Sequence, residues 1–558
     1  MRKRKTKTGL TVNAVAGTHV VTLGLDLSDH RRKDCLGFAI QREDHVEDEK
    51  YWMLGMKTFE ATDPGLGPGG QVSSRQHPFQ SFQWADYSAK PDYDYTYNVV
   101  PLYGSPKKLT EGEAVSVRIQ TEPELGKAHS AFFNRGSVAT QEYARRFQNK
   151  RPDQLVGEEK FAAYRWLSRG LLEAFENFVA RAKDKHFELL GAVYEFQWPE
   201  ALQALKAAAK VAKKVSIIYD AIPGASGPKK KNVKAIDHEK VKALCIPRTH
   251  GKIMHNKFLV LVKNETPIAV WTGSTNLTEN GIFGHSNCGH IIESKAVAAA
   301  YFAYWQQLEK DQASADDKTW TRDNNPDPAD PFDDNPTVVF SPRSGLALLK
   351  RYGVVAGSAK EALFMTFAFG MNKIFQDVYE QHDGILRFAL MEKEGTGKNL
   401  AQAKVDIRRI RSLPNVVVAI GYNIATNSFD RWIQELNKVT KEAVNIHWVH
   451  TKYMLVDPLS KTPTVIVGSA NFSKPSTDTN HENMVVIRHD TRVADIYLGE
   501  FMRLYTHYAF REAVKRAADR GDTNWKPNYL DIKAARWQRD YYTPKNQRYL
   551  RRKYFAQT

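Results

Sequence analysis

One pattern of polar residues occurs twice in this chain, 195 positions apart. The first copy is His255-Asn256-Lys257 followed by Gly273-Ser274-Thr275-Asn276, and the second is His450-Thr451-Lys452 followed by Gly468-Ser469-Ala470-Asn471. In both copies the Gly lies 18 residues after the His and the Asn lies 21 after it. A single His-x-Lys is common by chance, whereas two copies with one shared spacing are not. The repeat predicts two similar halves that together build one site.

Each His-x-Lys lies in an apolar run, at residues 253–262 and 446–457, that is typical of a β-strand. Side chains alternate between the faces of a strand, so the His and the Lys of each copy point the same way. Two such strands that meet about a pseudo-twofold axis bring two imidazoles and two ammonium groups together. This set suits a phosphodiester, because one imidazole can attack phosphorus while the other protonates the leaving oxygen. Further hydrogen-bond donors to the phosphate are expected from the second part of each motif: Ser274, Asn276, Ser469 and Asn471.

These motifs resemble the signature of the phospholipase D superfamily, a duplicated H-x-K-x4-D followed by G-S-x-N. The second copy is complete and includes Asp457, with Glu482 eleven residues after its Asn. The first copy has Val262 and Asn287 at the two acidic positions. The resemblance covers about residues 130–520. It implies a phosphohistidine intermediate, no metal and no cofactor, with both His and both Lys catalytic in a site complete within one chain.

The nucleophile is expected to be His255, as in the first copy of the superfamily's motif. The residues add a reason, because the carboxylates Asp457 and Glu482 occur only in the second copy. A twofold arrangement can bring a carboxylate of one half to the His of the other. An attacking imidazole gains most from such a partner, which fixes its tautomer and stabilises its developing charge. Crossed pairing leaves His450 as the general acid beside Asn287 or backbone, whereas pairing within each half reverses the roles. Asp457 lies an odd number of residues after His450, so on a continuous strand it faces away.

The expected fold class is α/β, with a two-fold pseudo-symmetric core of two phospholipase D-like halves. An apolar strand and a helix precede each motif, at residues 189–196 and 199–214 and at 362–369 and 373–381. A helix follows each motif, at 297–308 and 493–504, and this alternation predicts α/β halves over residues 130–310 and 337–520. Residues 158–183 are predicted to form one amphipathic helix.

Residues 10–122 contain short alternating runs separated by turn signals, typical of a small all-β sandwich of the immunoglobulin or fibronectin type. Such a domain is expected to position the core or to bind a protein partner. Residues 311–336 are acidic and proline-rich and predict a linker, either simply solvated or acting as a nucleic-acid mimic that gates the site.

The tail, residues 521–558, interleaves basic and aromatic residues. Three interpretations are open: it binds nucleic acid by stacking, it lies on an anionic membrane, or it packs on its own domain. Weaker candidates for substrate binding are Arg135 near an expected helix start, Arg248, and Lys229, Lys230 and Lys231 in an expected basic loop leading to His255.

The formal net charge is +17, which favours polyanionic partners, nucleic acid or anionic phospholipid, although excess Lys and Arg can also merely solubilise. Three scattered cysteines and no apolar run long enough to cross a membrane lead us to expect a cytoplasmic protein, with peripheral membrane binding as a variant. No cluster has metal-ligand spacing.

Two functions fit the motifs: a metal-independent nuclease, and a phospholipase D that hydrolyses or transfers phosphatidyl headgroups. Charge, the expected basic loop and the tail favour the nuclease. A non-catalytic binding module is disfavoured, because both His and both Lys are retained.

Overall fold

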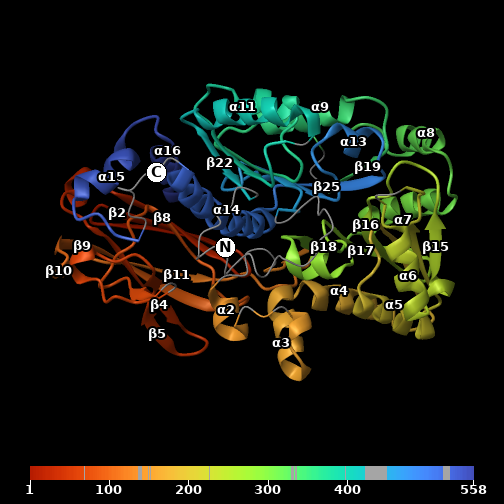
Figure 1. The fold of residues 1–558 in the computed structure, drawn as a ribbon, viewed down its shortest axis with the longest axis horizontal. Coiled ribbons are helices and arrows are strands. Elements are labelled where there is room, and N and C mark those ends of the chain that lie inside the picture. Colours follow the sequence, from red (N-terminus) through yellow and green to blue (C-terminus); the bar gives the residue numbers. More distant parts are fainter. Residues whose placement is uncertain are drawn as a thin grey trace.

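The computed structural model describes the chain except residues 68–69, 136–140, 149, 151, 225–226, 329–331, 333–335, 396, 422–448 and 520–527. An all-β N-terminal region is followed by two α/β halves, each built on a seven-stranded sheet (Figure 1). The fold class expected from the sequence is therefore confirmed.

The N-terminal region consists of two antiparallel sheets that share one core. The first has the order β1 (Arg2–Lys7), β2 (Leu10–Ala16), β3 (Val21–Leu27), β8 (Gln83–Asp86). The second has the order β10 (Lys108–Glu111), β9 (Asp94–Ser105), β4 (Gly37–Asp44), β5 (Glu49–Trp52), and β11 (Val115–Gln120) also pairs with β9. Leu23, Ile40 and Tyr97 from both sheets meet in this core. The region starts at Arg2 and not at residue 10, because the basic first residues form an edge strand whose charged side chains face solvent.

The two halves repeat the same topology. The first sheet has the order β12 (His129–Phe133), β18 (Cys288–Ile292), β17 (Thr266–Gly273), β16 (Lys257–Lys263), β13 (Phe187–Val193), β14 (Lys214–Asp220), β15 (Cys245–Arg248). The second has the order β19 (Thr337–Ser341), β25 (Glu482–Arg488), β24 (Thr464–Gly468), β23 (Tyr453–Val456), β20 (Ala362–Phe367), β21 (Leu386–Met391), β22 (Val416–Ile420). In each sheet the last three strands are parallel and the other pairs are antiparallel.

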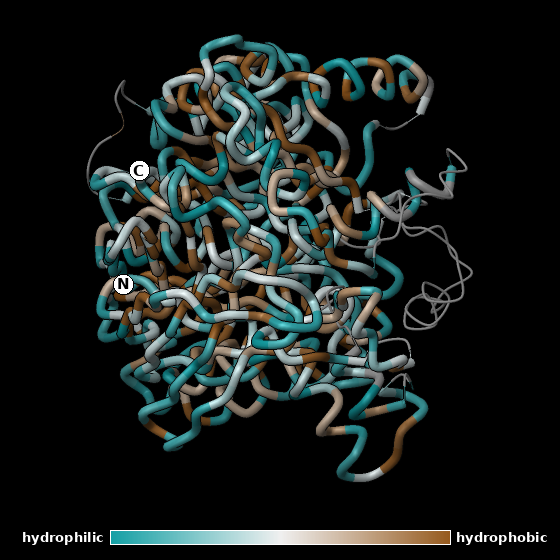
Figure 2. Tube along the Cα trace, turned by 90° about the vertical axis from the view of Figure 1, so that its left-hand side faces the viewer, coloured by the Kyte–Doolittle hydropathy of each residue, from teal (hydrophilic) through white to brown (hydrophobic). Residues whose placement is uncertain are grey.

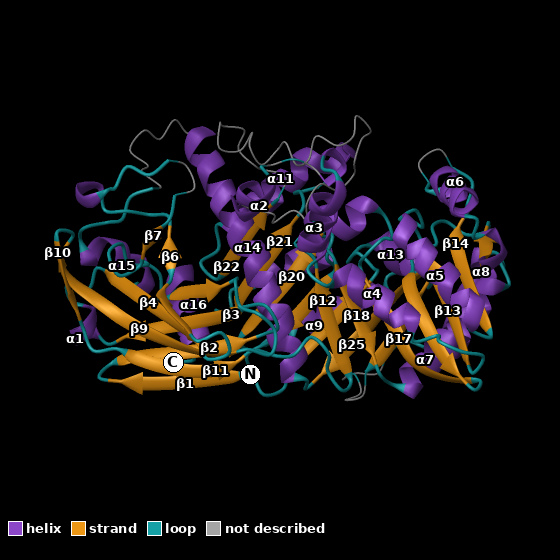
Figure 3. Cartoon of the chain, turned by 90° about the horizontal axis from the view of Figure 1, so that it is seen from below, coloured by secondary structure: helices purple, strands orange, loops and turns teal. Residues whose placement is uncertain are grey.

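Helices flank both sheets (Figure 3). Those of the first half are α2 (Gln141–Phe147), α3 (Gly157–Ser168), α4 (Leu171–Ala180), α5 (Pro199–Val211), α6 (Lys229–Glu239) and α7 (Lys295–Glu309). Those of the second are α9 (Ala347–Gly357), α10 (Lys373–Tyr379), α11 (Leu400–Arg411), α13 (Lys474–Asp478) and α14 (Thr491–Asp519). The single helix predicted over residues 158–183 is wrong: Arg169 and Gly170 have φ of 47° and 87°, which end α3 before α4 begins.

The halves meet around a continuous apolar core to which α7 and α14 both contribute. Phe258 of β16 packs edge-on against Tyr301, and Tyr453 of β23 packs edge-on against Tyr497. Hydrophobic segments (brown in Figure 2) run through the interior, whereas hydrophilic segments (teal) make up most of the outer loops.

Residues 311–336 are more than a solvated linker. They contain α8 (Ser314–Asn324), whose Asp317 and Thr321 are buried against the rest of the protein. Charged residues and prolines dominate the composition of this segment, so its composition does not reveal the two buried residues of α8.

The basic aromatic tail packs on its own protein. Its helices α15 (Ala534–Tyr542) and α16 (Gln547–Ala556) lie on the N-terminal sheets (Figure 1). The indole N–H of Trp537 donates to the carbonyl of Cys35 at 2.9 Å, and Asn13 Nδ2 donates to the carbonyl of Phe555 at 2.9 Å. A side chain at Gly24 would collide with that same carbonyl. Trp537, Tyr554 and Phe555 are buried, so stacking of these rings on bases or insertion in a membrane is excluded.

Candidate active site

The two motif histidines lie where the halves join. His255 comes just before β16 and His450 just before β23, so the strands begin later than the apolar runs predict. Single bridges of backbone pairing join the halves next to each one, Met254 with His481 and Ser286 with Val449. The amide of His255 also donates to the carbonyl of His481 at 2.9 Å.

Two carboxylates missed by sequence reasoning hold these segments. Asp220, at the end of β14, accepts a hydrogen bond from the amide of Met254 at 2.8 Å. Glu392, just after β21, accepts one from the amide of Val449 at 2.8 Å. The two acids come at the carboxyl ends of β14 and β21, which pair in parallel with β13 and β20. An acidic residue at this equivalent position in both halves was the sequence signal that could have identified them.

The histidines take their partners from the opposite halves. His255 Nδ1 lies 2.8 Å from Glu482 Oε2, and His450 Nδ1 lies 2.7 Å from Asn287 Oδ1. This is the crossed pairing expected from the distribution of acidic residues. The two partners therefore differ in charge, with an anion beside His255 and a neutral amide beside His450.

The partners also set the tautomers. The Nδ2 of Asn287 donates to the carbonyl of Gly281 at 2.7 Å, so its oxygen faces His450 and accepts from the Nδ1–H of that imidazole. A carboxylate only accepts, so His255 likewise carries its proton on Nδ1. The motif serines donate to the same acceptors, Ser274 to Asn287 at 2.8 Å and Ser469 to Glu482 at 2.7 Å. Both Nε2 atoms remain for chemistry.

The two lysines bond back to their own motifs, Lys257 Nζ to the carbonyl of His255 at 2.7 Å and Lys452 Nζ to the carbonyl of His450 at 2.5 Å. Burial lowers the pKa of Lys257 to about 8 and holds the pKa of Lys452 well below its usual range. Both groups would be stabilised in their charged form by an anion.

Burial lowers the pKa of His255 to about 4, against the opposing effect of the Glu482 carboxylate. Burial, followed by the charge of Lys452, holds the pKa of His450 well below its usual range. With pKa values lowered in this way, both imidazoles are neutral near neutral pH. A neutral imidazole is the form that can attack phosphorus.

The first half contributes a polar wall that sequence reasoning also missed. Asn276 Nδ2 donates to Glu195, and burial raises the pKa of this carboxyl. The ring of Tyr194 lies edge-on to the His255 imidazole with centroids 4.9 Å apart, and Lys257 Nζ lies 5.2 Å from the same ring centroid. The signal was a Tyr-Glu pair ending an apolar strand. In the second half, Asn471 Oδ1 is buried without a hydrogen-bond partner in the described part of the chain.

Asp457 has no part in this site. It follows β23 and accepts hydrogen bonds from the amides of Lys360, Glu361 and Ala362 at 2.9, 2.7 and 2.9 Å, so it holds the start of β20. Its expected supporting role is therefore wrong, although its direction away from His450 agrees with the odd spacing.

Two arginines proposed as weak substrate contacts are structural. Arg248 is fully buried and bonds the carbonyls of Leu308 and Gln312 together with Asp317. Arg135 donates to the carbonyl of Trp166 at 2.5 Å and stacks on its indole at 4.5 Å. Their side chains are occupied by the protein itself.

The expected basic loop is instead the first turn of α6, which begins at Lys229. Lys230 and Lys231 are exposed there. Lys231 is the one that reaches the site electrostatically, because its charge lowers the pKa of Glu195 against the raising effect of burial. Lysine is a good helix former, and Pro228, whose φ of −78° is compatible with a helix, stands directly before α6.

Among the residues that the structure describes, no group of His, Cys, Asp or Glu side chains could hold a metal ion. Cys35, Cys245 and Cys288 are free thiols. A search of the described helices finds none long and apolar enough to cross a membrane.

Comparison with known proteins supports the repeat. A family model described as "Cardiolipin synthase, PLD-like domain" matches residues 179–309 and 399–505. No curated protein sequence matches significantly.

Three of the solved structures that are similar to this chain illustrate the range of these matches. Polyphosphate kinase of Porphyromonas gingivalis is 13% identical, with TM-score 0.35 over 58% of this chain and 46% of that one, so this chain spans less than half of the kinase. Phosphatidylserine synthase of Haemophilus influenzae is 9% identical, with TM-score 0.40 over 63% and 91%. Nuc, a phospholipase D family member of Salmonella typhimurium, is 20% identical, with TM-score 0.23 over 31% and 96%. With TM-scores below 0.5, none of them bears on what this chain does.

The family model matches one segment in each half. Each matched segment contains one His-x-Lys motif with its Gly-Ser-x-Asn. The two matched segments, one in each half of the chain, therefore belong to this PLD-like family.

Proposed function

We propose that this protein is a metal-independent phosphodiesterase that works through a covalent phosphohistidine at His255. The observation that carries the proposal is the crossed pairing, which sets a carboxylate behind one imidazole and a neutral amide behind the other. Attack by an imidazole places positive charge on its ring, and only His255 has an anion at Nδ1 to stabilise that charge.

In the first step, His255 Nε2 attacks phosphorus and its Nδ1–H stays hydrogen-bonded to Glu482. The bond from phosphorus to the leaving oxygen breaks, and this oxygen takes a proton from Nε2 of the charged His450. In the second step, the now neutral His450 removes a proton from water, which attacks phosphorus and releases His255. Lys257 and Lys452 offset the charge on the other phosphate oxygens throughout.

The acid role requires a protonated His450, although burial and the charge of Lys452 hold its pKa well below the usual range. A bound phosphodiester supplies the missing negative charge and raises this pKa. The site therefore becomes competent when substrate arrives, and no metal ion is needed in any step.

We propose nucleic acid as the substrate class. The net charge of +17 favours a polyanion. Lys230 and Lys231 on α6, exposed and in the second case electrostatically linked to the site, support a path for a charged backbone. The packed tail no longer supports this choice.

Phosphatidyl transfer or hydrolysis is the second candidate. It is favoured by the matching family model, whose description names cardiolipin synthase. An anionic lipid surface would also satisfy the positive charge.

One assay separates the candidates. The protein is incubated in EDTA with labelled single-stranded DNA, double-stranded DNA, RNA, and vesicles of phosphatidylcholine or phosphatidylglycerol, beside a His255→Asn control. Cleavage of nucleic acid alone is expected. Headgroup release from vesicles alone would replace the nuclease by the lipid enzyme, and activity that vanishes in EDTA and returns with a divalent metal would refute the metal-independent mechanism.

A further inference from the structure

The residue before Glu482 ties the two halves together by its backbone. The amide of His481 donates to the carbonyl of Ile253 at 2.9 Å, and the carbonyl of His481 accepts from the amide of His255 at 2.9 Å. This bridge places the main chain carrying the carboxylate next to the main chain carrying the imidazole. Any slip of residue 481 would therefore change the contact between Glu482 and His255.

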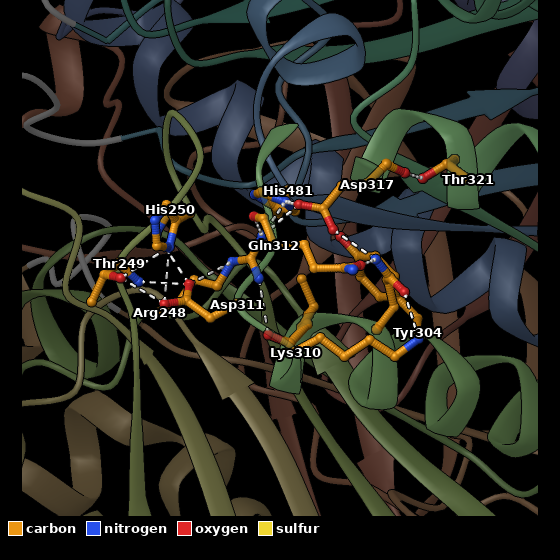
Figure 4. A network of polar contacts seen from close by, with 12 residues as sticks. Arg248, Thr249, His250, Tyr304, Lys310, Asp311, Gln312, Asp317, Thr321 and His481 are labelled. Atoms are coloured by element: carbon orange, nitrogen blue, oxygen red, sulfur yellow. Dashed lines mark hydrogen bonds and ion pairs between the residues drawn. The ribbon is translucent and has the colours of Figure 1, made fainter. Parts of the chain in front are cut away.

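The side chain of His481 is anchored in the segment that connects the halves (Figure 4). It is fully buried, and its Nε2 lies 2.8 Å from Asp317 Oδ2 of α8. Its Nδ1 has no hydrogen-bond partner in the described part of the chain, and Arg248 Nη2 lies farther from its Nε2, at 3.4 Å, so Asp317 is the principal polar contact of this imidazole.

Asp317 is itself held rigidly. Arg248, from the end of β15, bonds the same carboxylate oxygen, and Gln307 Nε2 donates to the other oxygen at 3.0 Å. Arg248 in turn bonds the carbonyls at both ends of the turn between α7 and α8, at Leu308 and Gln312. The anchor in the connecting segment is therefore tied to the first half through Arg248, while the residue it holds belongs to the second.

The segment leading to His255 encloses the anchored imidazole. A Cβ at Gly251 would lie 2.7 Å from Cε1 of His481, and Gly251 has a φ of 107°, so no larger residue fits there. Asp311 accepts hydrogen bonds from the amides of Thr249 and His250 at 2.9 and 3.1 Å, which fixes this loop.

The pseudo-symmetric position carries a different side chain. The residue before Asn287 is Ser286, whose backbone forms the equivalent bridge to Val449 but whose side chain carries no imidazole. Among the described residues, an imidazole anchored by a buried ion pair therefore lies on the side where a carboxylate faces His255.

We propose that Asp317 and His481 are positioning residues, which hold the bridge so that Glu482 aligns the imidazole of His255 for attack. This inference rests on the proposed catalytic role of His255. The segment between the halves thereby becomes part of the nucleophile's support. Loss of the anchor is expected to slow attack without weakening substrate binding, because neither side chain belongs to the phosphate pocket.

The test compares His481→Ala, His481→Gln and Asp317→Asn with Lys318→Ala. Lys318 is the next residue of α8 and donates to Asp478 of the second half at 2.8 Å. Its loss therefore removes one ion pair between α8 and the second half but does not change the contacts of His481. The substrate is bis(p-nitrophenyl) phosphate. For His481→Ala and Asp317→Asn, kcat is expected to fall about 10- to 100-fold with KM nearly unchanged, as for a small misplacement of a reacting group. His481→Gln, which can keep a donor toward Asp317, is expected to recover most of the loss, and Lys318→Ala to match the wild type.

A second measurement does not depend on turnover. In protein labelled with ¹⁵N-histidine, the Nδ1–H proton of His255 is expected far downfield, and is assigned by its loss in His255→Asn. It should move upfield or broaden in His481→Ala and Asp317→Asn, and stay in place in Lys318→Ala. If His481→Ala does not fold, His481→Gln and Asp317→Asn carry the comparison.

The two proposals fail in different ways. A shifted His255 proton in a protein that cleaves no phosphodiester would refute the proposed function and support the positioning role. An active protein in which these variants lose thermal stability but keep kcat and the His255 proton would reduce the anchor to a structural one and overturn this inference.

Discussion

Glu482→Gln removes the negative charge behind the proposed nucleophile and leaves the shape of the side chain. At 2.8 Å, an imidazolium and a carboxylate attract each other by roughly 6 kcal/mol at an effective dielectric constant of about 20. At about 1.36 kcal/mol for each factor of ten, full loss of this attraction would slow attack by about 10⁴-fold.

The hydrogen bonds around Glu482 add a second cost. Its Oε2 accepts from Ser469 and His255, and its Oε1 accepts from Asn480 at 3.3 Å. An amide N–H₂ in either place faces a donor, and one that faces His255 would force the proton onto Nε2 and block attack. We expect the rate constant of the first step, attack by His255, to fall by about 10³- to 10⁴-fold, as when a carboxylate partner of a catalytic His becomes an amide.

The assay is single-turnover release of p-nitrophenolate from a p-nitrophenyl phosphodiester. This weakly basic leaving group needs little help from an acid. Glu482→Gln and His255→Asn should therefore abolish this release, while His450→Asn should retain it and block the later hydrolysis of the phosphohistidine. Release that stays within tenfold of the wild-type rate in Glu482→Gln, or is lost equally in His450→Asn, would refute the assignment of roles.

Three further outcomes are expected. Binding of inorganic phosphate near neutral pH should take up protons, because an anion raises the depressed pKa values of His450 and Lys452; calorimetry in buffers of different ionisation enthalpy would detect this, and zero uptake would contradict it. Trp537→Ala should lower the free energy of unfolding by about 3–5 kcal/mol with kcat unchanged, as for a large ring removed from a core, whereas an unchanged melting temperature would return the tail to a surface role. Asp457→Ala should cost about 1–2 kcal/mol of stability, because three backbone amides at the start of β20 lose their acceptor and that of Ala362 is partly buried; a large loss of kcat in the folded variant would restore this residue to the site.

The shared motif spacing predicted two similar halves that build one site. A twofold arrangement of these halves allowed crossed pairing, but the sequence left pairing within each half open as well. The loss of acidic residues from the first copy then indicated which His keeps a carboxylate, and the structure places Glu482 at His255 and Asn287 at His450.

Residues that act on backbone leave weaker marks in the sequence. Asp220 and Glu392 hold the main chain before each His, and no fixed side-chain spacing connects them to the motifs. The anchor on His481 comes from α8. The composition of this segment resembles a linker, because most residues of α8 are polar or charged and only two of its residues, Asp317 and Thr321, are buried.

Composition also misleads where burial decides the role of a residue. Aromatic and basic residues alternate in the tail in the same way whether the rings face nucleic acid or a core. The break after α3 depends on Arg169, a non-glycine residue in the left-handed region, which no apolar periodicity can indicate.

The most direct test of the central claim is to identify the residue that becomes phosphorylated. The enzyme is mixed with a slowly hydrolysed phosphodiester, quenched at alkaline pH to preserve phosphohistidine, digested and mapped by mass spectrometry. The account predicts the substrate's phosphoryl group on His255, with none in Glu482→Gln over the same time. Label on His450 alone would contradict it.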